Sequence, residues 1–202
     1  MSLENERMRF YFRNCNQIEE WVALRSEAAG AVHQWLCEIE QDVLNLATEL
    51  GPDVELENET AEKQPWPFFR LLRPSWRCGR SGPVPVCVTL QWHRTNTTLC
   101  GANLPYVALA SGKEDLIGAA LRHSQEVQAV RKSRKDQTSV YSVGWGRVLL
   151  PGAFPETADE YRAALVAALR KAWTDYAHHV DAVVLVVQNG ATGPAAAATV
   201  GE

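Results

Sequence analysis

The first quarter of the chain has the apolar spacing of a long amphipathic helix. Its apolar side chains fall in two rows at heptad spacing, namely Ile18, Val32, Ile39 and Leu46 in one row and Val22, Ala29, Leu36, Val43 and Leu50 in the other. Asn16 with Glu19 three residues later matches a capping box, and Gly51 followed by proline is a helix stop. The pattern predicts a helix from Asn16 to Leu50, with Ser26 and Gly30 as points where it could divide into two.

Alternating apolar and polar residues after this helix predict strands. The clearest alternation runs from Val84 to Trp92 and is typical of a half-buried strand, with one face in the core and the other in water. Glycine and proline at 79–83 predict a loop or hairpin turn before it. Further strands are predicted at 53–57, 68–72, 98–100, 104–110 and 140–150.

Two more helices complete the predicted order. One runs from Glu114 to Arg131, and the last begins at Thr157, where Glu160 completes a capping box. The inner side of the last helix is an apolar stripe of Leu165, Leu169, Trp173, Tyr176 and Val180. The β-branched run at 183–187 either continues this helix or forms a short strand.

Grouped strands with short loops indicate an α+β fold. We expect a mostly antiparallel sheet of four to six strands, covered by the long N-terminal helix, the middle helix and the C-terminal helix. We expect a single domain at 14–188 and an N-terminal arm at 1–13. Residues 189–202 hold little apolar bulk to bury, so we expect them to form a disordered tail.

Composition narrows the class of protein only slightly. The chain has 202 residues, 46% of them hydrophobic, and a formal net charge of −4, which suits one well-packed globular core. No apolar run approaches the ~18 residues of a membrane span, and the N-terminus lacks the charge pattern of a signal peptide. The five cysteines are widely spaced and form no Cys-x-x-Cys pair, so we expect reduced thiols and a cytoplasmic protein.

The net charge is the sum of three segments of alternating sign. Residues 1–63 have fourteen acidic and five basic residues, a net of −9, and residues 64–150 have four acidic and twelve basic residues, a net of +8. Residues 151–202 have a net charge of −3. No acidic residue occurs between Gln64 and Lys113, where arginines alternate with aromatic residues. Arginine pairs with phosphate or carboxylate and aromatic faces stack on unpaired bases, so this segment favours a contact surface.

We therefore expect a small non-catalytic binding or accessory protein that contacts an acidic protein or a nucleic acid through a basic, aromatic-rich surface. The candidate contact residues are Arg70, Arg73, Trp76, Arg77, Arg80 and Arg94, with Arg131, Lys132, Arg134 and Lys135 as a second patch. Two alternatives stay open beside it. The acidic first helix could neutralise the basic sheet within the chain, or the first helix could join copies into a homo-oligomer.

The competing hypothesis is a divalent-metal-dependent nuclease. The order helix, three strands, helix, strand is similar to that of the PD-(D/E)xK nuclease core, a likeness in element order alone. Four acids alternate at 53–59, so Asp53, Glu55 and Glu57 could share one strand face and bind Mg²⁺, with Lys63 assisting. The same acids also suit a wet edge strand. The clearest strand lacks the acid-x-lysine that such a nuclease needs, so a degenerate nucleic-acid-binding domain is the more natural form of this alternative.

Other catalytic or metal-binding constellations are weak. Asp175 and His179 lie four residues apart on the last predicted helix, but a surface pair accounts for this spacing better than a metal site does. The sequence contains no nucleophile elbow, Walker loop, dinucleotide fingerprint or His-Glu-x-x-His motif. We therefore assign no catalytic residue, metal ligand or cofactor, and we expect no membrane partner.

Overall fold

The computed structural model describes residues 3–60, 63–77, 85–99, 103–112, 115–153 and 155–191. Within these ranges the helices are α1 (Leu3–Cys37), α2 (Glu40–Leu50), α3 (Leu116–His123), α4 (Gln125–Arg134) and α5 (Ala158–Ala191). The strands are β1 (Glu55–Glu59), β2 (Phe68–Leu72), β3 (Cys87–Gln91), β4 (Tyr106–Ala110), β5 (Gln137–Ser139) and β6 (Ser142–Arg147). A short 3-10 helix, η1 (Pro74–Arg77), follows β2.

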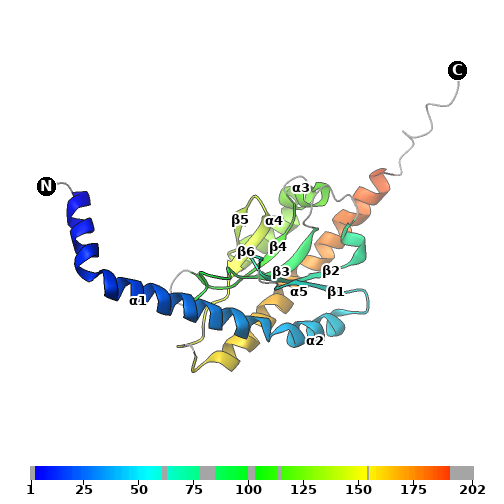
Figure 1. Cartoon of the computed structure of the whole chain (residues 1–202). Helices are drawn as coiled ribbons and strands as arrows, with labels where there is room; N and C mark the ends of the chain where they lie inside the picture. Colours follow the sequence, from blue (N-terminus) through cyan, green and yellow to red (C-terminus); the bar gives the residue numbers. More distant parts are fainter. Residues whose placement is uncertain are drawn as a thin grey trace, which may run out of the picture.

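All six strands join one antiparallel sheet in the order β1-β2-β3-β4-β6-β5. The first four strands pair in sequence order, and β5 and β6 form a hairpin whose second strand pairs with β4. α3 and α4 lie in the connection between β4 and β5 (Figure 1). The predicted α+β class, with an antiparallel sheet and long terminal helices, is confirmed.

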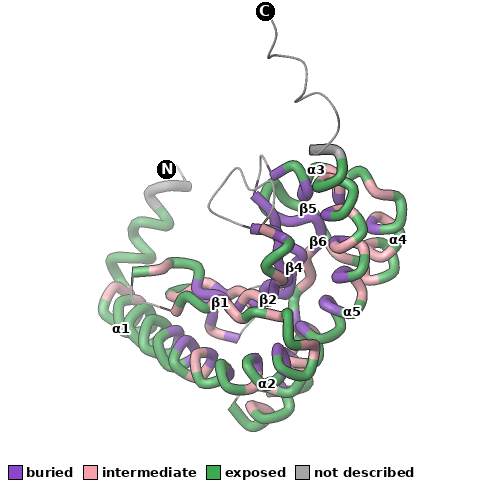
Figure 2. The backbone as a smooth tube through the Cα atoms, turned by 90° about the vertical axis from the view of Figure 1, so that its right-hand side faces the viewer, coloured by how far each residue is buried: buried purple, intermediate pink, exposed green. Residues whose placement is uncertain are grey.

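One face of the sheet carries the core. Alternate positions on the central strands point to this face, and they are Phe69, Leu71, Val88, Leu90, Val107 and Leu109. α5 packs against β3 and β4, and α2 packs against β1 and β2. Tyr176 of α5 approaches β6 at Gly144, the partner of Leu109, which places α5 on the core face. In Figure 2 the helices α2, α4 and α5 gather along one side of the strands.

α1 and α2 divide at a different place from the one predicted. α1 begins at Leu3, well before Asn16, and it continues through both Ser26 and Gly30. The division falls at Ile39, which is fully buried and keeps a helical backbone conformation between the two helices. Burial of Ile39 in the core, rather than a helix-breaking residue, sets the point where the chain changes direction.

Three other elements differ from the sequence prediction. The predicted middle helix is two helices, because the Ser124 hydroxyl accepts a hydrogen bond from the Val127 backbone and caps a new helix there. The strand predicted at 98–100 does not form over its described residues, where Leu99 has φ 56°. The run at 183–187 continues α5, which extends to Ala191. The remainder of the predicted tail lies outside the described residues, as do the 79–83 turn and Val84.

β3 is buried on both faces rather than one. Cys87, Val88, Thr89 and Leu90 are all buried, although only Val88 and Leu90 point to the helices. On the other face Cys87 and Thr89 lie beside Ala110 and Ala108 of β4, which are buried as well. None of the helices in the described ranges is long and apolar enough to cross a membrane.

Candidate functional site

The second face of the sheet is not covered by any helix that the structure describes, and it is the candidate site. Strand register arranges its side chains in two rows that cross the sheet. The first row is Glu57, Arg70, Thr89, Ala108 and Trp145, and the second is Glu59, Phe68, Gln91, Tyr106 and Arg147. The rows are two residues apart on every strand, so all ten side chains point to the same side. We call this surface the open face because no described helix packs on it, although Phe68, Thr89 and Ala108 within it are buried.

Arginines and aromatic rings of the open face contact one another. The Arg70 guanidinium lies 3.5 Å from the centre of the Phe68 ring, and the Arg147 guanidinium lies 5.8 Å from the Trp145 ring. Tyr106 and Trp145 meet edge to face, with ring centres 5.6 Å apart. Neither arginine forms an ion pair with an acidic residue of the described chain. Arg147 is exposed and Arg70 is half-buried.

Tyr106 is a neutral hydrogen-bond donor with a fixed ring. Burial raises the pKa of its hydroxyl to about 12, against the opposing positive charge of Arg70. The hydroxyl donates to Oε1 of Gln91, its neighbour across β3 and β4, at 2.7 Å. The ring thus stays uncharged at neutral pH and keeps one orientation between β3 and β6.

A hollow of about 320 Å³ lies at the end of the open face. Trp66 and His93 extend the two strands β2 and β3 into it, and their rings meet edge to face at 4.5 Å. Tyr106, Trp145 and Arg147 line it as well, and its remaining walls come from Thr97, Asn103, Leu104, Ser139 and Ser142. This volume is at the lower end of small-molecule sites, so the hollow suits a single flat ring system with polar edges.

Glycines on both sides of Trp145 account for its position on the open face. Gly144 and Gly146 point to the core face, where a Cβ at Gly144 would lie 2.7 Å from the Tyr176 hydroxyl oxygen. A Cβ at Gly146 would lie 3.0 Å from Oδ1 of Asp136. β6 therefore lies close against α5 on one side and presents a large ring on the other. The Gly-Trp-Gly sequence was the visible signal of this arrangement.

Trp76 and Arg73, two of the predicted contact residues, are part of the internal packing. Trp76 is fully buried, and its ring stacks on Trp173 with centres 4.9 Å apart. Its Nε1 donates to Oδ1 of Asp181 at 2.7 Å. Arg73 pairs with the other oxygen of Asp181 at 3.2 Å and with Asp53 at 3.3 Å. Trp76 offers no surface to a partner in this fold, which corrects its predicted role.

Arg77 and Arg94 also bind groups within the chain. Arg77 donates to Oε2 of Glu55 at 2.5 Å and to Oε1 of Glu57 at 2.7 Å. Arg94 donates to two backbone carbonyls of the connection between β1 and β2, at 2.7 and 3.2 Å. These two side chains brace the first hairpin, and Arg70 is the member of the first predicted patch that lies on the open face.

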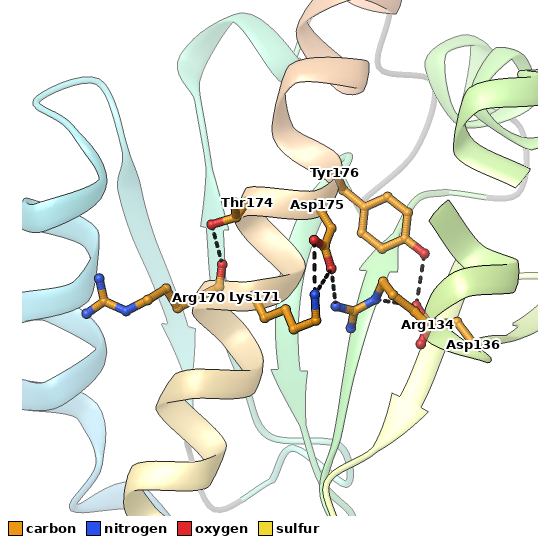
Figure 3. Close-up of polar contacts among 7 residues, drawn as sticks. All are labelled: Arg134, Asp136, Arg170, Lys171, Thr174, Asp175 and Tyr176. Atoms are coloured by element: carbon orange, nitrogen blue, oxygen red, sulfur yellow. Dashed lines mark hydrogen bonds and ion pairs between the residues drawn. The ribbon is translucent and has the colours of Figure 1, made fainter. Parts of the chain in front are cut away.

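Arg134, from the second predicted patch, belongs to a polar network between α4, β5 and α5 (Figure 3). It donates to Oδ2 of Asp136 and to Oδ2 of Asp175, each at 2.8 Å, and the Tyr176 hydroxyl donates to Asp136 at 2.9 Å. Burial opposes ionisation of Asp175, yet Arg134 and Lys171 together hold the pKa of its carboxyl below the usual value. Arg134 thus joins α4 to α5 and does not present its charge to solvent.

The rest of the second patch lies at the end of α4. Lys132 and Lys135 are exposed and Arg131 is half-buried, so cations gather at the helix end where its dipole is negative. Lys135 adopts a left-handed conformation, with φ 59°, that ends the helix. Arg80 lies outside the described residues. The ten predicted contact residues therefore do not form one surface.

Much of the acidic charge is matched inside the molecule. Arg162 and Arg170 of α5 pair with Asp42 and Glu49 of α2, in addition to the Arg73 and Arg77 pairs with β1. The acids that neutralise the arginines therefore come from α2 and β1 rather than from α1. Asp42 and Glu49 belong to the predicted first helix, but they pair with α5 and not with the basic sheet, whose Arg73 and Arg77 pair with acids at 53–57 and with Asp181.

The acidic strand has the geometry expected for the nuclease alternative but not its free carboxylates. Glu55, Glu57 and Glu59 do share one face, yet Arg77 binds the first two. Over the described residues, no group of three or more His, Cys, Asp or Glu side chains is placed to hold a metal ion. Lys63 is exposed. On α5, Asp175 is bound by Arg134, so it does not form the metal pair considered for it.

Three comparisons with known proteins returned no match: no family model, no curated protein sequence and no solved structure resembles this chain.

Phe68, Tyr106, Trp145 and Arg147 were missed as site residues from sequence. Two strands must be paired in the correct register before their alternate positions can be combined into one surface. The open face is a set of aromatic rings with two arginines and an adjoining hollow.

Proposed function

We propose that this protein is a non-catalytic binding protein that takes single-stranded nucleic acid on its open face. The observation that carries the proposal is the pair of cross-strand rows that set the half-buried rings of Tyr106 and Trp145 on one face with Arg70 and Arg147. No helix of the described chain covers these side chains.

The chemistry of the open face favours unpaired bases over a folded acidic protein. Aromatic rings on a sheet offer flat surfaces, and stacking of one base on such a ring contributes about 1–3 kcal/mol. Phe68 is buried beneath the Arg70 guanidinium, so the half-buried rings of Tyr106 and Trp145 are the ones that a base can reach. Arg70 and Arg147 lie beside these rings, where a guanidinium can pair with a phosphate oxygen.

The charge of the surface limits the binding path. Glu57, at the end of the first row, is already paired with Arg77, so Glu59 at the end of the second row is the carboxylate that would repel a polyanion from that edge of the sheet. The path therefore crosses β2, β3, β4 and β6 and ends at the hollow beside Trp66. A base inserted between Trp66 and Trp145 would contact polar atoms of the hollow at its edge.

The experiment is a titration of fluorescently labelled single-stranded RNA and DNA, with duplex DNA and a poly-glutamate peptide as comparison ligands. Trp145→Ala should weaken single-strand binding by about 5- to 150-fold, the equivalent of one lost stacking contact. Leu185→Ala, which removes an exposed apolar side chain from α5, is the control and should bind like the wild type. With two phosphate-pairing arginines, the plot of log affinity against log salt should have a slope of about −1.4.

Three results would overturn the proposal. Unchanged affinity of Trp145→Ala would show that the open face is not the binding surface. Tighter binding of poly-glutamate than of either single strand would assign the face to an acidic protein. Cleavage of the labelled strand in Mg²⁺ or Mn²⁺ would make the protein an enzyme.

A further inference from the structure

The first part of α1 extends beyond the body of the molecule and bends toward its N-terminal end (Figure 1). We call residues 6–25 the overhang; at 1.5 Å per residue it is about 30 Å long. Fifteen large apolar side chains of the described chain are exposed, and seven of them lie between Met8 and Leu24. Exposed apolar side chains concentrated on one projecting helix indicate an interaction surface rather than chance.

Met8, Tyr11 and Val22 of the overhang continue the seam that α1 already uses in the core, whereas Phe10, Phe12, Trp21 and Leu24 lie off it. Ala29, Val32 and Leu36 are buried against the sheet and the other helices. Counting back from them at alternating steps of three and four gives Arg25, Val22, Ile18, Cys15, Tyr11 and Met8. This spacing is the a/d repeat of a coiled coil, with Arg25 as the one charged member. The same helix face is therefore buried in its last third and exposed or half-buried in its first two thirds.

The charges of the overhang identify its partner as a second copy of the same chain. Residues 6–13 contain three arginines and one glutamate, a net of +2, whereas residues 19–27, which extend two residues past the overhang, contain three glutamates and one arginine, a net of −2. In an antiparallel pair the positive half of each helix lies beside the negative half of the other. In a parallel pair, like charges would face each other. We infer that two copies associate through an antiparallel coiled coil formed by their overhangs.

The contact area is sufficient for a weak, reversible dimer. Tyr11, Phe12 and Trp21 together can bury about 300 Å² of surface that is exposed in the monomer, since aromatic side chains bury about 150–250 Å² each. Met8, Ile18 and Val22 bring the buried area to about 1,000 Å² for both copies, which is the lower bound of a specific interface. A dimer of this size should exchange with monomer in the micromolar range.

A lipid surface is a poorer partner for the overhang. Helices that lie in a membrane interface have a polar face dominated by lysine and arginine. Here Glu19, Glu20 and Glu27 would face the headgroups together with the arginines. The seam also has heptad spacing, which a lipid surface does not require.

Substitutions at two residues with nearly equal exposed fractions test whether dimerisation depends on the seam or on any exposed apolar side chain. Val22 is 56% exposed and lies on the seam, whereas Leu24 is 55% exposed and lies on the opposite side of the helix. Sedimentation equilibrium of the full chain should show dimers for the wild type and for Leu24→Glu. Val22→Glu should raise the dimer dissociation constant by at least about tenfold, because two carboxylates enter an apolar seam.

The direction of the helices is tested by disulfide cross-linking in a Cys15→Ser background. The antiparallel seam places Met8 of one copy beside Arg25 of the other, and it separates the two Met8 positions by about 25 Å. Met8→Cys and Arg25→Cys chains should cross-link when mixed and not when oxidised separately, with Cys15→Ser alone as the control.

Four outcomes would overturn the inference. These are a wild-type chain that stays monomeric at high micromolar concentration, equal effects of the Val22 and Leu24 changes, cross-linking of Met8→Cys chains to one another, and vesicle binding without self-association. Circular dichroism of each variant confirms that a loss of dimer is not a loss of fold.

Discussion

Gly144 gives a sharp test of how closely β6 and α5 pack. A Cβ at this position would lie 2.7 Å from the hydroxyl oxygen of Tyr176, whereas the next nearest atoms, on Arg131 and Asp136, are 3.4 Å away. That hydroxyl donates to Asp136 at 2.9 Å, so it cannot move without losing the bond. The prediction is that Gly144→Ala destabilises the wild type and is tolerated when the Tyr176 hydroxyl is absent.

The structure sets the expected change in the free energy of unfolding for Gly144→Ala, for Tyr176→Phe and for the double variant. Gly144→Ala overpacks a buried contact and should lower the free energy of unfolding by about 1–3 kcal/mol. Tyr176→Phe removes one hydrogen bond to a carboxylate and should cost about 1.5–3 kcal/mol. In the double variant the added methyl group meets no atom nearer than 3.4 Å, so it should cost little beyond the loss of the hydroxyl. The coupling between the two changes should therefore be about 1–3 kcal/mol.

Urea unfolding followed by tryptophan fluorescence measures all four proteins under one condition. Gly30→Ala is the control, because a Cβ there meets no atom within 4 Å and glycine is disfavoured inside a helix. It should stabilise the protein by about 0.5–1 kcal/mol. If Gly144→Ala costs the same with and without the Tyr176 hydroxyl, the close contact between β6 and α5 is refuted.

Three further predictions concern buried groups. Asp181→Ala should lower the free energy of unfolding by about 1–3 kcal/mol in urea, because it leaves the Trp76 indole nitrogen without an acceptor. Cys87 should resist alkylation in the native protein at pH 8 and react in urea, as read by mass spectrometry, because burial raises the pKa of its thiol to about 12. His33 accepts a hydrogen bond from Trp92, and burial lowers the pKa of its imidazole in the folded protein below the unfolded value of 6.5. The free energy of unfolding should therefore be greatest above pH 6.5 and should decrease as the pH falls from 6.5 through the folded-state pKa, because the unfolded chain then binds more protons. His33→Gln should reduce that loss in urea titrations at pH 7.5 and 5.5.

Each of these predictions has a direct contradiction. Asp159 is exposed on the same helix as Asp181, so Asp159→Ala is the control for removal of a carboxylate. If both substitutions lower the free energy of unfolding equally, the hydrogen bond between Trp76 and Asp181 does not stabilise the fold. Rapid modification of native Cys87 would show that β3 is open to solvent. An equal decline in stability for His33→Gln and the wild type would assign the acid sensitivity to other groups.

The sequence predicted elements well where the signal was local. Phe68–Leu72 was predicted at its observed bounds, and the capping residues near Thr157 marked the start of α5 to within a residue. It failed at Ile39, where an ordinary helix-forming stretch turns because the side chain enters the core. No residue there breaks a helix by itself, so only tertiary packing fixes the position.

The site was predictable only in part. The residue types that form it can be read from the sequence, but the strand pairing that brings them together cannot. The interleaved arginines and aromatic residues were visible, and Arg70 does lie on the open face. Which of them face inward depends on partners far along the chain, such as Asp181 for Trp76, 105 residues away. Trp145 and Arg147 join Arg70 only through strand register, which the sequence does not state.

β1 protects the edge of β2 from pairing with strands of other molecules. β2 reads Phe-Phe-Arg-Leu-Leu, and β1 pairs with its whole length. A chain shortened to begin at residue 60 would expose β2 as an apolar edge, open to pairing with the strands of other molecules. The same cut would remove a net charge of −9, since thirteen acids and four arginines precede residue 60. Such a fragment would adhere to nucleic acids and aggregate, so only the full chain can report specific binding.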